Sequence, residues 1–318
     1  MKSLLLSLLI AVTLWADAHL FVYHRFGDSR YPTTNTTIEE LRSQFEYFKN
    51  NGYKVVPLEK LISHLKTRKN IPNKWIVLTI DDNFKSFYTN GLALFKKYDY
   101  PFSIFVYVEA TQKRYPDYLS WDELKEISKY GSIEFHSYAH KHMTYMSDEE
   151  IKEDFKKGLE VFSKELNIKP KVFTYPYGEY SPRVKEISKS FGFDAIINQN
   201  MGAVSGFSDI YDIDRTALVG KSNLKLYLRY KALNAFWKEP LVFPHNATLT
   251  SLHVETNESA KKGGVYITGH GWMKAALENG NFNIKLNKKL IKKRSRIVIS
   301  IGNKISTKLL IKDKYGTK

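Results

Sequence analysis

Hydrophobic and polar positions alternate along the first two thirds of the chain in a way that predicts parallel strands joined by helices. Short apolar runs rich in β-branched and aromatic residues are separated by stretches whose apolar residues recur at helical spacing. This order is typical of an α/β domain in which helical crossovers connect the strands of one sheet. The expected strands are Leu20–His24, Trp75–Thr79, Phe102–Val108, Ser132–Phe135, Val172–Tyr175 and Asp194–Ile197, and the expected helices are 37–50, 86–98, 120–130, 148–166 and 181–190.

Beyond Trp237 the helical spacing fades. Alternating stretches appear instead at Phe282–Leu286, Arg296–Ile301 and Lys308–Ile311, separated by Gly and Asn turns. We therefore expect an α/β fold with a barrel-like domain over residues 19–237 and a small, all-β C-terminal domain over residues 238–318.

The first eighteen residues have the layout of a secretory signal peptide. Lys2 precedes an apolar stretch from Leu4 to Trp15, and a small-x-small cleavage site follows at 16–18. The mature chain is then expected to begin near His19, and an uncleaved membrane anchor is the alternative. Either interpretation predicts a secreted, periplasmic or cell-envelope location.

The amino-acid composition restricts the kinds of catalysis and of metal site that the chain can have. The chain has no cysteine, which excludes disulfides, thiolate catalysis and Cys-ligated zinc, so any metal must be held by His and carboxylates. Of the formal charge of +16, residues 281–318 supply +11, from twelve Lys or Arg and the single Asp313. For an exported chain this predicts an anionic envelope polymer or a lipid surface as partner, and no nucleic acid; a solvated basic sheet face is the alternative.

Polar residues directly follow four of the expected strands. They are Tyr23-His24-Arg25, Asp81-Asp82-Asn83, the stretch from His136 to His140 and the stretch from Tyr175 to Gly178. Loops after the carboxyl ends of parallel strands converge on one face, so these groups are expected to form a single site.

Two histidines four residues apart and a carboxylate from a neighbouring strand end suit a facial metal site. We expect His136, His140 and Asp82 as ligands, with an open position for water, and zinc as the metal, cobalt and nickel being alternatives. Asp81, beside the ligand, is the expected general base. Taken alone, the Asp pair would suit a helix N-cap, and His142 is expected to face solvent or to support the site.

These motifs resemble the polysaccharide deacetylases of carbohydrate esterase family 4. Thr79-Ile80-Asp81-Asp82 is similar to the first motif of that family, the His136–His140 stretch to its second and Tyr175–Gly178 to its third. The resemblance covers roughly residues 19–235 and implies a distorted (β/α) barrel with fewer than eight regular strands. It also implies an Asp base followed by an Asp ligand, two His ligands, and an oxyanion held by the amide of Tyr177.

Two features depart from the family pattern. The Arg that usually orients the base is replaced by Thr174, and no clear Leu-His motif supplies a general acid. Arg25 or Arg215 is expected to orient Asp81 instead, and His24 to protonate the leaving amine.

Further candidates concern the glycan. His270, in the expected β domain, is interpreted as structural or glycan-contacting. Tyr138, Tyr177 and Trp121 are candidates for stacking on sugar rings, although core packing explains such aromatics equally well. The opening stretch Phe21–Phe26 is similar to the subgroup that deacetylates biofilm poly-N-acetylglucosamine.

The combined hypothesis is a metal-dependent hydrolase that removes N-acetyl groups from an N-acetylglucosamine polysaccharide. A catalytically inactive, glycan-binding protein of the cell envelope is the first alternative. A surface-anchoring protein whose basic β domain carries the main function is the second.

Overall fold

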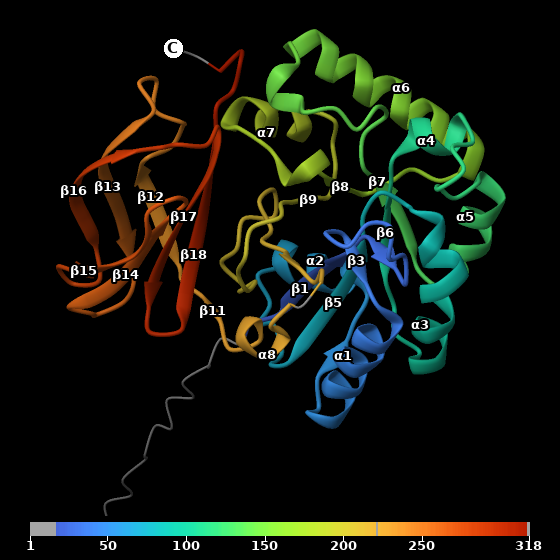
Figure 1. Cartoon of the computed structure of the whole chain (residues 1–318), viewed down its shortest axis with the longest axis horizontal. Helices are drawn as coiled ribbons and strands as arrows, with labels where there is room; N and C mark the ends of the chain where they lie inside the picture. Colours follow the sequence, from blue (N-terminus) through green and yellow to red (C-terminus); the bar gives the residue numbers. More distant parts are fainter. Residues whose placement is uncertain (1–16, 221, 317–318) are drawn as a thin grey trace, which may run out of the picture.

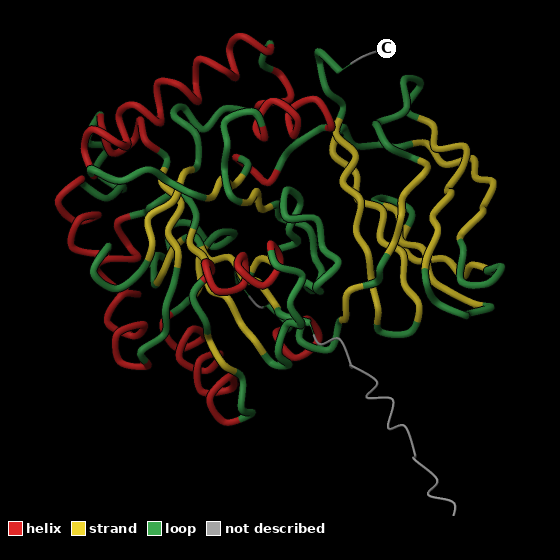
Figure 2. The backbone as a smooth tube through the Cα atoms, turned by 180° about the vertical axis from the view of Figure 1, so that it is seen from behind, coloured by secondary structure: helices red, strands yellow, loops and turns green. Residues whose placement is uncertain are grey.

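A computed structural model describes residues 17–220 and 222–316 (Figures 1 and 2). The expected signal peptide therefore lies outside the described residues except for its last two positions. Ala18 exchanges backbone hydrogen bonds with Val204, at 2.9 and 2.8 Å, and a carboxylate oxygen of Asp17 accepts the amide of Ala232 at 3.0 Å. Both residues thus contact the folded domain, and cleavage near His19 stays a prediction.

The α/β part is a parallel sheet curved into an incomplete barrel, which confirms the expected fold class. Its strands run in the order β10-β1-β5-β6-β7-β8-β9, with β4 also paired to β5. The strands are β1 (His19–Tyr23), β4 (Lys54–Val55), β5 (Trp75–Ile80), β6 (Ser103–Val106), β7 (Ser132–Phe135), β8 (Val172–Thr174), β9 (Ala195–Ile197) and β10 (Thr216–Ala217).

A loop closes the ring between β9 and β10 where a regular ladder would otherwise stand. A parallel bridge pairs Ile197 with Ile213, and the amide of Arg215 donates to the carbonyl of Asn200 at 3.0 Å. Closure therefore carries the Arg215 side chain into the barrel, where it is 1% exposed.

Helices cover the outside of this sheet (Figure 1). Three of them begin at capping boxes, which explains why their starts were predictable: Thr37 with Glu40, Ser120 with Glu123, and Ser147 with Glu150. The helices are α1 (Ile38–Asn50), α2 (Leu58–Lys66), α3 (Leu92–Tyr98), α4 (Val108–Gln112), α5 (Trp121–Ile127), α6 (Asp148–Leu166), α7 (Pro182–Lys189) and α8 (Leu224–Tyr227), with a π-helical turn at Phe87–Gly91 and 3₁₀ turns at Met143–Tyr145 and Pro176–Gly178.

The C-terminal part is the expected all-β domain, orange to red in Figure 1. A five-stranded sheet, β11-β18-β17-β14-β15, and a three-stranded sheet, β12-β13-β16, enclose a core separate from that of the barrel. β12 contains Trp237, so this sheet begins a few residues before the expected boundary at 238. The strands are β11 (Lys231–Ala232), β12 (Ala235–Glu239), β13 (Thr248–Thr256), β14 (Lys262–Ile267), β15 (Gly271–Ala276), β16 (Phe282–Lys289), β17 (Arg294–Ile301) and β18 (Lys304–Ile311); β2 (Arg25–Phe26) and β3 (Asn35–Thr36) form a small pair in the barrel.

β18 fastens the β domain to the barrel. Leu309 and Ile311 belong to the hydrophobic core of the barrel, and the Thr307 hydroxyl donates to the carbonyl of Met201 at 2.7 Å. Just beyond the strand, Arg183 of α7 donates to Asp313 at 3.0 and 3.1 Å. These contacts hold the two parts in a fixed arrangement. In the described ranges, no helix is long and apolar enough to cross a membrane.

Candidate active site

The strand ends bring the three expected metal ligands together. Asp82 follows β5, and His136 and His140 follow β7. One oxygen of Asp82 lies 3.3 Å from Nε2 of His136 and 3.0 Å from Nε2 of His140, and one ligand atom from each residue lies within 4.8 Å of the others. The three side chains expected as ligands are therefore close enough together to hold one metal ion.

The chemistry of these three side chains fits a divalent metal. Oδ1 of Asp82 is buried and has no hydrogen-bond donor. Nδ1 of His136 lies 2.8 Å from the carbonyl oxygen of Thr174, which can only accept, so Nδ1 carries the proton and Nε2 presents its lone pair towards Asp82. A carboxylate oxygen and two imidazole nitrogens are a donor set for zinc and similar ions.

Electrostatics favour a cation at the same place. Burial alone would lower the pKa of His136, but the carboxylates of Asp81 and Asp82 outweigh it and raise that pKa above its ordinary value. Burial would raise the pKa of Asp82, yet the adjacent His136 and His140 imidazoles hold it well below its ordinary value. The pocket therefore stabilises positive charge, and protons and a metal compete for it.

Several residues at this site have strained backbone conformations. Non-glycine residues rarely adopt positive φ, which costs energy that the surrounding structure must offset. Positive φ occurs in three of the four polar stretches that follow strands, at Asp82 (66°), Asn83 (43°), Ser137 (70°), His140 (49°) and Tyr177 (59°). Gly178 also has positive φ, and a Cβ there would lie 2.4 Å from Cβ of Gln199. The loops are thus held in conformations that local sequence preference alone would not select.

Asp81, the expected base, is clamped by Arg215. The guanidinium donates to both carboxylate oxygens at 2.7 Å, and also to the Thr79 hydroxyl at 2.9 Å. Asp81 is 2% exposed. Burial alone would raise its pKa, but Arg215 and the neighbouring histidines hold the pKa below its ordinary value, so the carboxylate is ionised at neutral pH.

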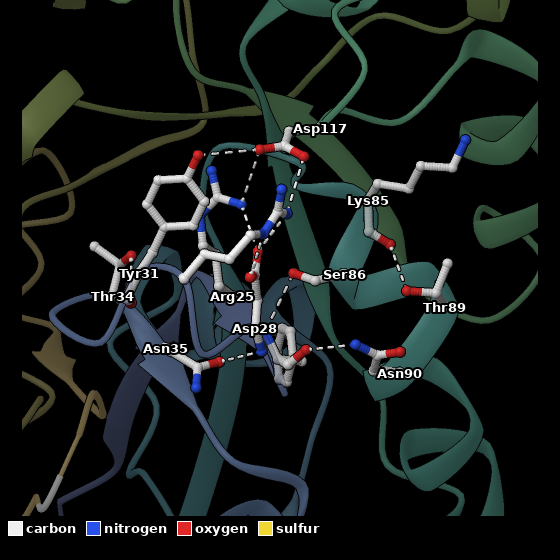
Figure 3. A network of polar contacts seen from close by, with 12 residues as sticks. Arg25, Asp28, Tyr31, Thr34, Asn35, Lys85, Ser86, Thr89, Asn90 and Asp117 are labelled. Atoms are coloured by element: carbon white, nitrogen blue, oxygen red, sulfur yellow. Dashed lines mark hydrogen bonds and ion pairs between the residues drawn. The ribbon is translucent and has the colours of Figure 1, made fainter.

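Arg25, the other sequence candidate for this clamp, is engaged elsewhere. It donates to Asp28 at 2.9 Å and lies 3.6 Å from Asp117 (Figure 3). Its guanidinium also lies over the rings of Tyr31 and Phe84, 3.8 and 3.6 Å from their centroids. Of the two arginines weighed from the sequence, Arg215 alone reaches Asp81.

His24, at the end of β1, lies within electrostatic range of both aspartates. Its Nδ1 atom is buried and has no hydrogen-bond partner. Burial lowers its pKa, against the opposing effect of Asp82 and Asp81, so the ring is neutral at neutral pH. An acid role for His24 would therefore require it to take up a proton during the reaction.

Tyr177 and His142 stand at the mouth of the site. The Tyr177 ring is 43% exposed, lies 4.5 Å from the His140 ring, and stacks on the His142 ring with centroids 4.0 Å apart. Nδ1 of His142 lies 2.6 Å from Glu179. His142 is therefore a supporting, half-exposed residue outside the metal ligand set.

The remaining candidates have structural roles. Tyr138 is 7% exposed and donates to Gln112 at 2.9 Å, and Trp121 packs against the barrel core. Nε2 of His270 lies 2.8 Å from the carbonyl oxygen of Lys289 and fixes a turn of the β domain. Of the three aromatics considered for sugar stacking, Tyr177 is the one exposed at this site.

Two supporting residues were missed from the sequence. Asp154 accepts the amides of Tyr138 and Ala139, at 2.9 and 2.8 Å, and so pins the loop between the two histidines. Its signal was available, because it sits on the apolar face of a helix beside Phe155. Thr174 was noted only as a lost arginine, yet its carbonyl and hydroxyl both hold His136.

Known proteins resemble this chain over the barrel. The polysaccharide deacetylase family model matches residues 68–196, which include the candidate metal ligands and Asp81. The poly-β-1,6-N-acetyl-D-glucosamine N-deacetylase of Escherichia coli K12 is 23% identical over 242 residues, covering 63% of this chain and 35% of that protein. The chain thus spans about a third of the length of this relative.

Solved structures share the fold. The deacetylase PplD of Streptococcus pyogenes, in complex with acetate, has a TM-score of 0.60 at 19% identity and covers 65% of this chain and 94% of that one. IcaB from Ammonifex degensii has a TM-score of 0.56 at 24% identity and covers 64% and 92%. At these identities the likeness establishes the barrel fold.

The candidate ligand set predicts which substitutions weaken metal binding. His140→Ala and Asp82→Asn should each lower the affinity for Zn²⁺ by at least about tenfold, because each removes one of three ligands. Competition with a metal-sensitive dye measures this directly. His142→Ala is the matched control, and a loss of affinity in that variant equal to the loss in His140→Ala would contradict the assignment.

Proposed function

We propose that this chain, whose barrel belongs to the polysaccharide deacetylase family, is a metal-dependent hydrolase that removes N-acetyl groups from an N-acetylglucosamine-containing polysaccharide. The observation that carries the proposal is the buried, ionised Asp81, clamped by Arg215 directly beside the Asp82, His136 and His140 cluster. The name of the Escherichia coli relative makes β-1,6-linked N-acetylglucosamine the first substrate to test.

The residues divide the hydrolysis among them. A divalent ion held by Asp82, His136 and His140, with zinc the first choice and cobalt or nickel the alternatives, would polarise the acetyl carbonyl and the attacking water. Asp81 accepts a proton from that water as its oxygen bonds to the carbonyl carbon. Arg215 keeps the carboxylate ionised and aimed.

The second half of the reaction expels the amine. The amide of Tyr177 donates to the oxygen of the tetrahedral intermediate, as in other oxyanion sites. His24, in range of Asp81, takes up the proton that Asp81 accepted from the water, which returns Asp81 to its ionised form, and delivers it to the sugar nitrogen as the C–N bond breaks. The products are acetate and a glucosamine unit, so the polymer gains positive charge.

An inactive glycan-binding protein would have no physical use for the Asp81–Arg215 pair. Burying a carboxylate and a guanidinium is costly, and a binder could replace both with apolar groups. The pair therefore favours turnover over the inactive alternative.

The location and the role of the basic domain form part of the same proposal. The signal-type N-terminus supports a location outside the cytoplasm, as a secreted, periplasmic or envelope protein. The exposed lysines of β16, such as Lys285 and Lys289, suit an anionic envelope polymer or lipid surface and not nucleic acid, which an exported protein would not meet.

Asp81→Asn should separate metal binding from turnover. Acetate release from β-1,6-linked N-acetylglucosamine oligomers should fall at least about a hundredfold, because the amide cannot accept the proton, while Zn²⁺ affinity stays within about twofold. Enzymatic acetate assay and dye competition measure the two quantities. Undiminished acetate release in this variant would remove Asp81 as the base.

Arg215→Met should change the pH dependence. Without the guanidinium, burial dominates and the pKa of Asp81 rises, so the acid limb of the kcat/KM profile moves to higher pH. Arg215→Lys keeps the charge and should move the limb less. A profile that falls uniformly, with its acid limb in place, would argue against Arg215 as the group that ionises the base.

His24→Ala should slow amide hydrolysis by roughly a hundredfold if this residue protonates the leaving amine. In the ester 4-nitrophenyl acetate the leaving group is 4-nitrophenolate, which departs without protonation. Hydrolysis of this ester should therefore be much less affected. Comparing the two substrates tests the role, and equal loss for both, or unchanged amide turnover, would exclude His24 as the acid.

A further inference from the structure

One face of the five-stranded sheet carries two aromatic residues beyond the barrel. Tyr266 of β14 lies directly opposite Trp272 of β15 and Val298 of β17, and directly opposite residues of antiparallel strands share a face. Arg296 and Arg294 stand two and four positions before Val298 and therefore share this face as well. We call these aromatic and basic residues, Tyr266, Trp272, Arg294 and Arg296, the aromatic face.

The aromatic face is continuous with the mouth of the active site. Nη1 of Arg294 lies 3.5 Å from one carboxylate oxygen of Glu179, whose other oxygen lies 2.6 Å from Nδ1 of His142. His142 in turn stacks on Tyr177, next to the ligand His140. A line of contacts thus runs from the proposed metal centre to β17.

A second contact places the same sheet over the neighbouring loop of the barrel. Nη2 of Arg296 donates to the carbonyl of Gln199 at 3.1 Å. Glu179 and Gln199 follow β8 and β9, so the sheet leans against the carboxyl-end face, where the candidate active site lies. The strands farther along the sheet, β14 and then β15, extend this face away from the barrel.

Trp272 is built as a fixed platform. A Cβ on Gly264 would lie 2.7 Å from Oγ of Ser300 and 3.3 Å from two carbons of the indole, so the absence of a side chain there lets the ring approach β14 closely. The Tyr266 ring borders it with centroids 5.6 Å apart, yet Trp272 remains 55% exposed. An exposed aromatic ring that is already held in place loses little entropy when a ligand stacks on it.

One hydrogen-bond donor on this line of contacts also lacks an acceptor. Nε of Arg294 is buried and has no hydrogen-bond partner among the described residues. A buried donor without an acceptor is costly, so the Arg294 side chain is incompletely partnered. The Arg294 side chain is 33% exposed, so its guanidinium can donate to the polar groups of a pyranose unit whose apolar face stacks on Trp272.

We propose that the aromatic face is a distal part of the substrate groove, where Trp272 stacks on sugars several units away from the one being deacetylated. Strand geometry puts about 17 Å between the Cα atoms of Arg294 and Trp272, so the ligand is a polymer and not a single sugar. Arg294, Arg296 and Lys274 make the surface cationic, which favours the neutral, N-acetylated chain over the amine product. The inference rests on the proposed function for the identity of the polymer.

Chain-length dependence of the kinetics tests the groove. The wild type and Trp272→Ala would be compared on a disaccharide and an octasaccharide of β-1,6-linked N-acetylglucosamine. The preference for the longer substrate is the ratio of the two kcat/KM values. In Trp272→Ala this ratio should fall roughly tenfold through a higher KM for the octasaccharide, because the variant loses the apolar area that one face of the indole would bury against the sugar. Trp272→Tyr retains a flat ring and should restore most of the preference.

Phe236→Ala is the matched control. Phe236 is 53% exposed, almost as much as Trp272, but it belongs to β12 of the other sheet. This variant should keep the wild-type length preference. An unchanged preference in Trp272→Ala, or the same loss in Phe236→Ala, would overturn the proposed groove.

Binding without turnover separates this inference from the proposed function. Calorimetric titration of the octasaccharide into Asp81→Asn, and into Asp81→Asn with Trp272→Ala, should show roughly tenfold weaker binding in the double variant. Equal affinities would overturn the groove even if the wild type releases acetate. Trp272-dependent binding by a wild type that releases no acetate would instead uphold the groove and remove the proposed function.

Discussion

The pairing of Asp81 with Arg215 is the interaction on which the rest of the site depends. An isolated carboxylate this deeply buried would take up a proton and lose its use as a base. The partner lies 134 residues later in the chain and reaches Asp81 only through the loop that closes the barrel between β9 and β10. Closure of the barrel and ionisation of the proposed base therefore depend on the same loop, which links the stability of the fold to the chemistry of the site.

The candidate metal ligands depend on a second set of constraints, which hold loops in unfavourable conformations. Asp154 pins the loop between His136 and His140, and Thr174 orients the His136 ring, while positive φ recurs through the same loops. Such strain persists only where surrounding contacts over-determine it. The helices and the sheet supply that support, so the ligand atoms converge before any ion binds.

The position of the β domain beside the site follows from how the domain is attached to the barrel. Its own core is independent of the barrel, but β18 contributes Leu309 and Ile311 to the barrel core. This attachment sets β17 beside the mouth of the site, where Arg294 meets Glu179. A basic domain that composition alone would assign to an envelope surface is thereby a neighbour of the candidate active site, and the proposed aromatic face lies on it.

The sequence by itself determined most of the elements and the residue types of the site. Capping boxes and helical spacing placed α6 at its observed bounds, and the polar residues after each strand identified Asp82, His136 and His140, because these signals are local. Tertiary structure alone decided that Arg215, and not Arg25, contacts Asp81. It also placed the Tyr138 side chain in the interior and brought the Trp272 ring against Gly264. Those outcomes depend on contacts between residues far apart in the chain, which no local pattern encodes.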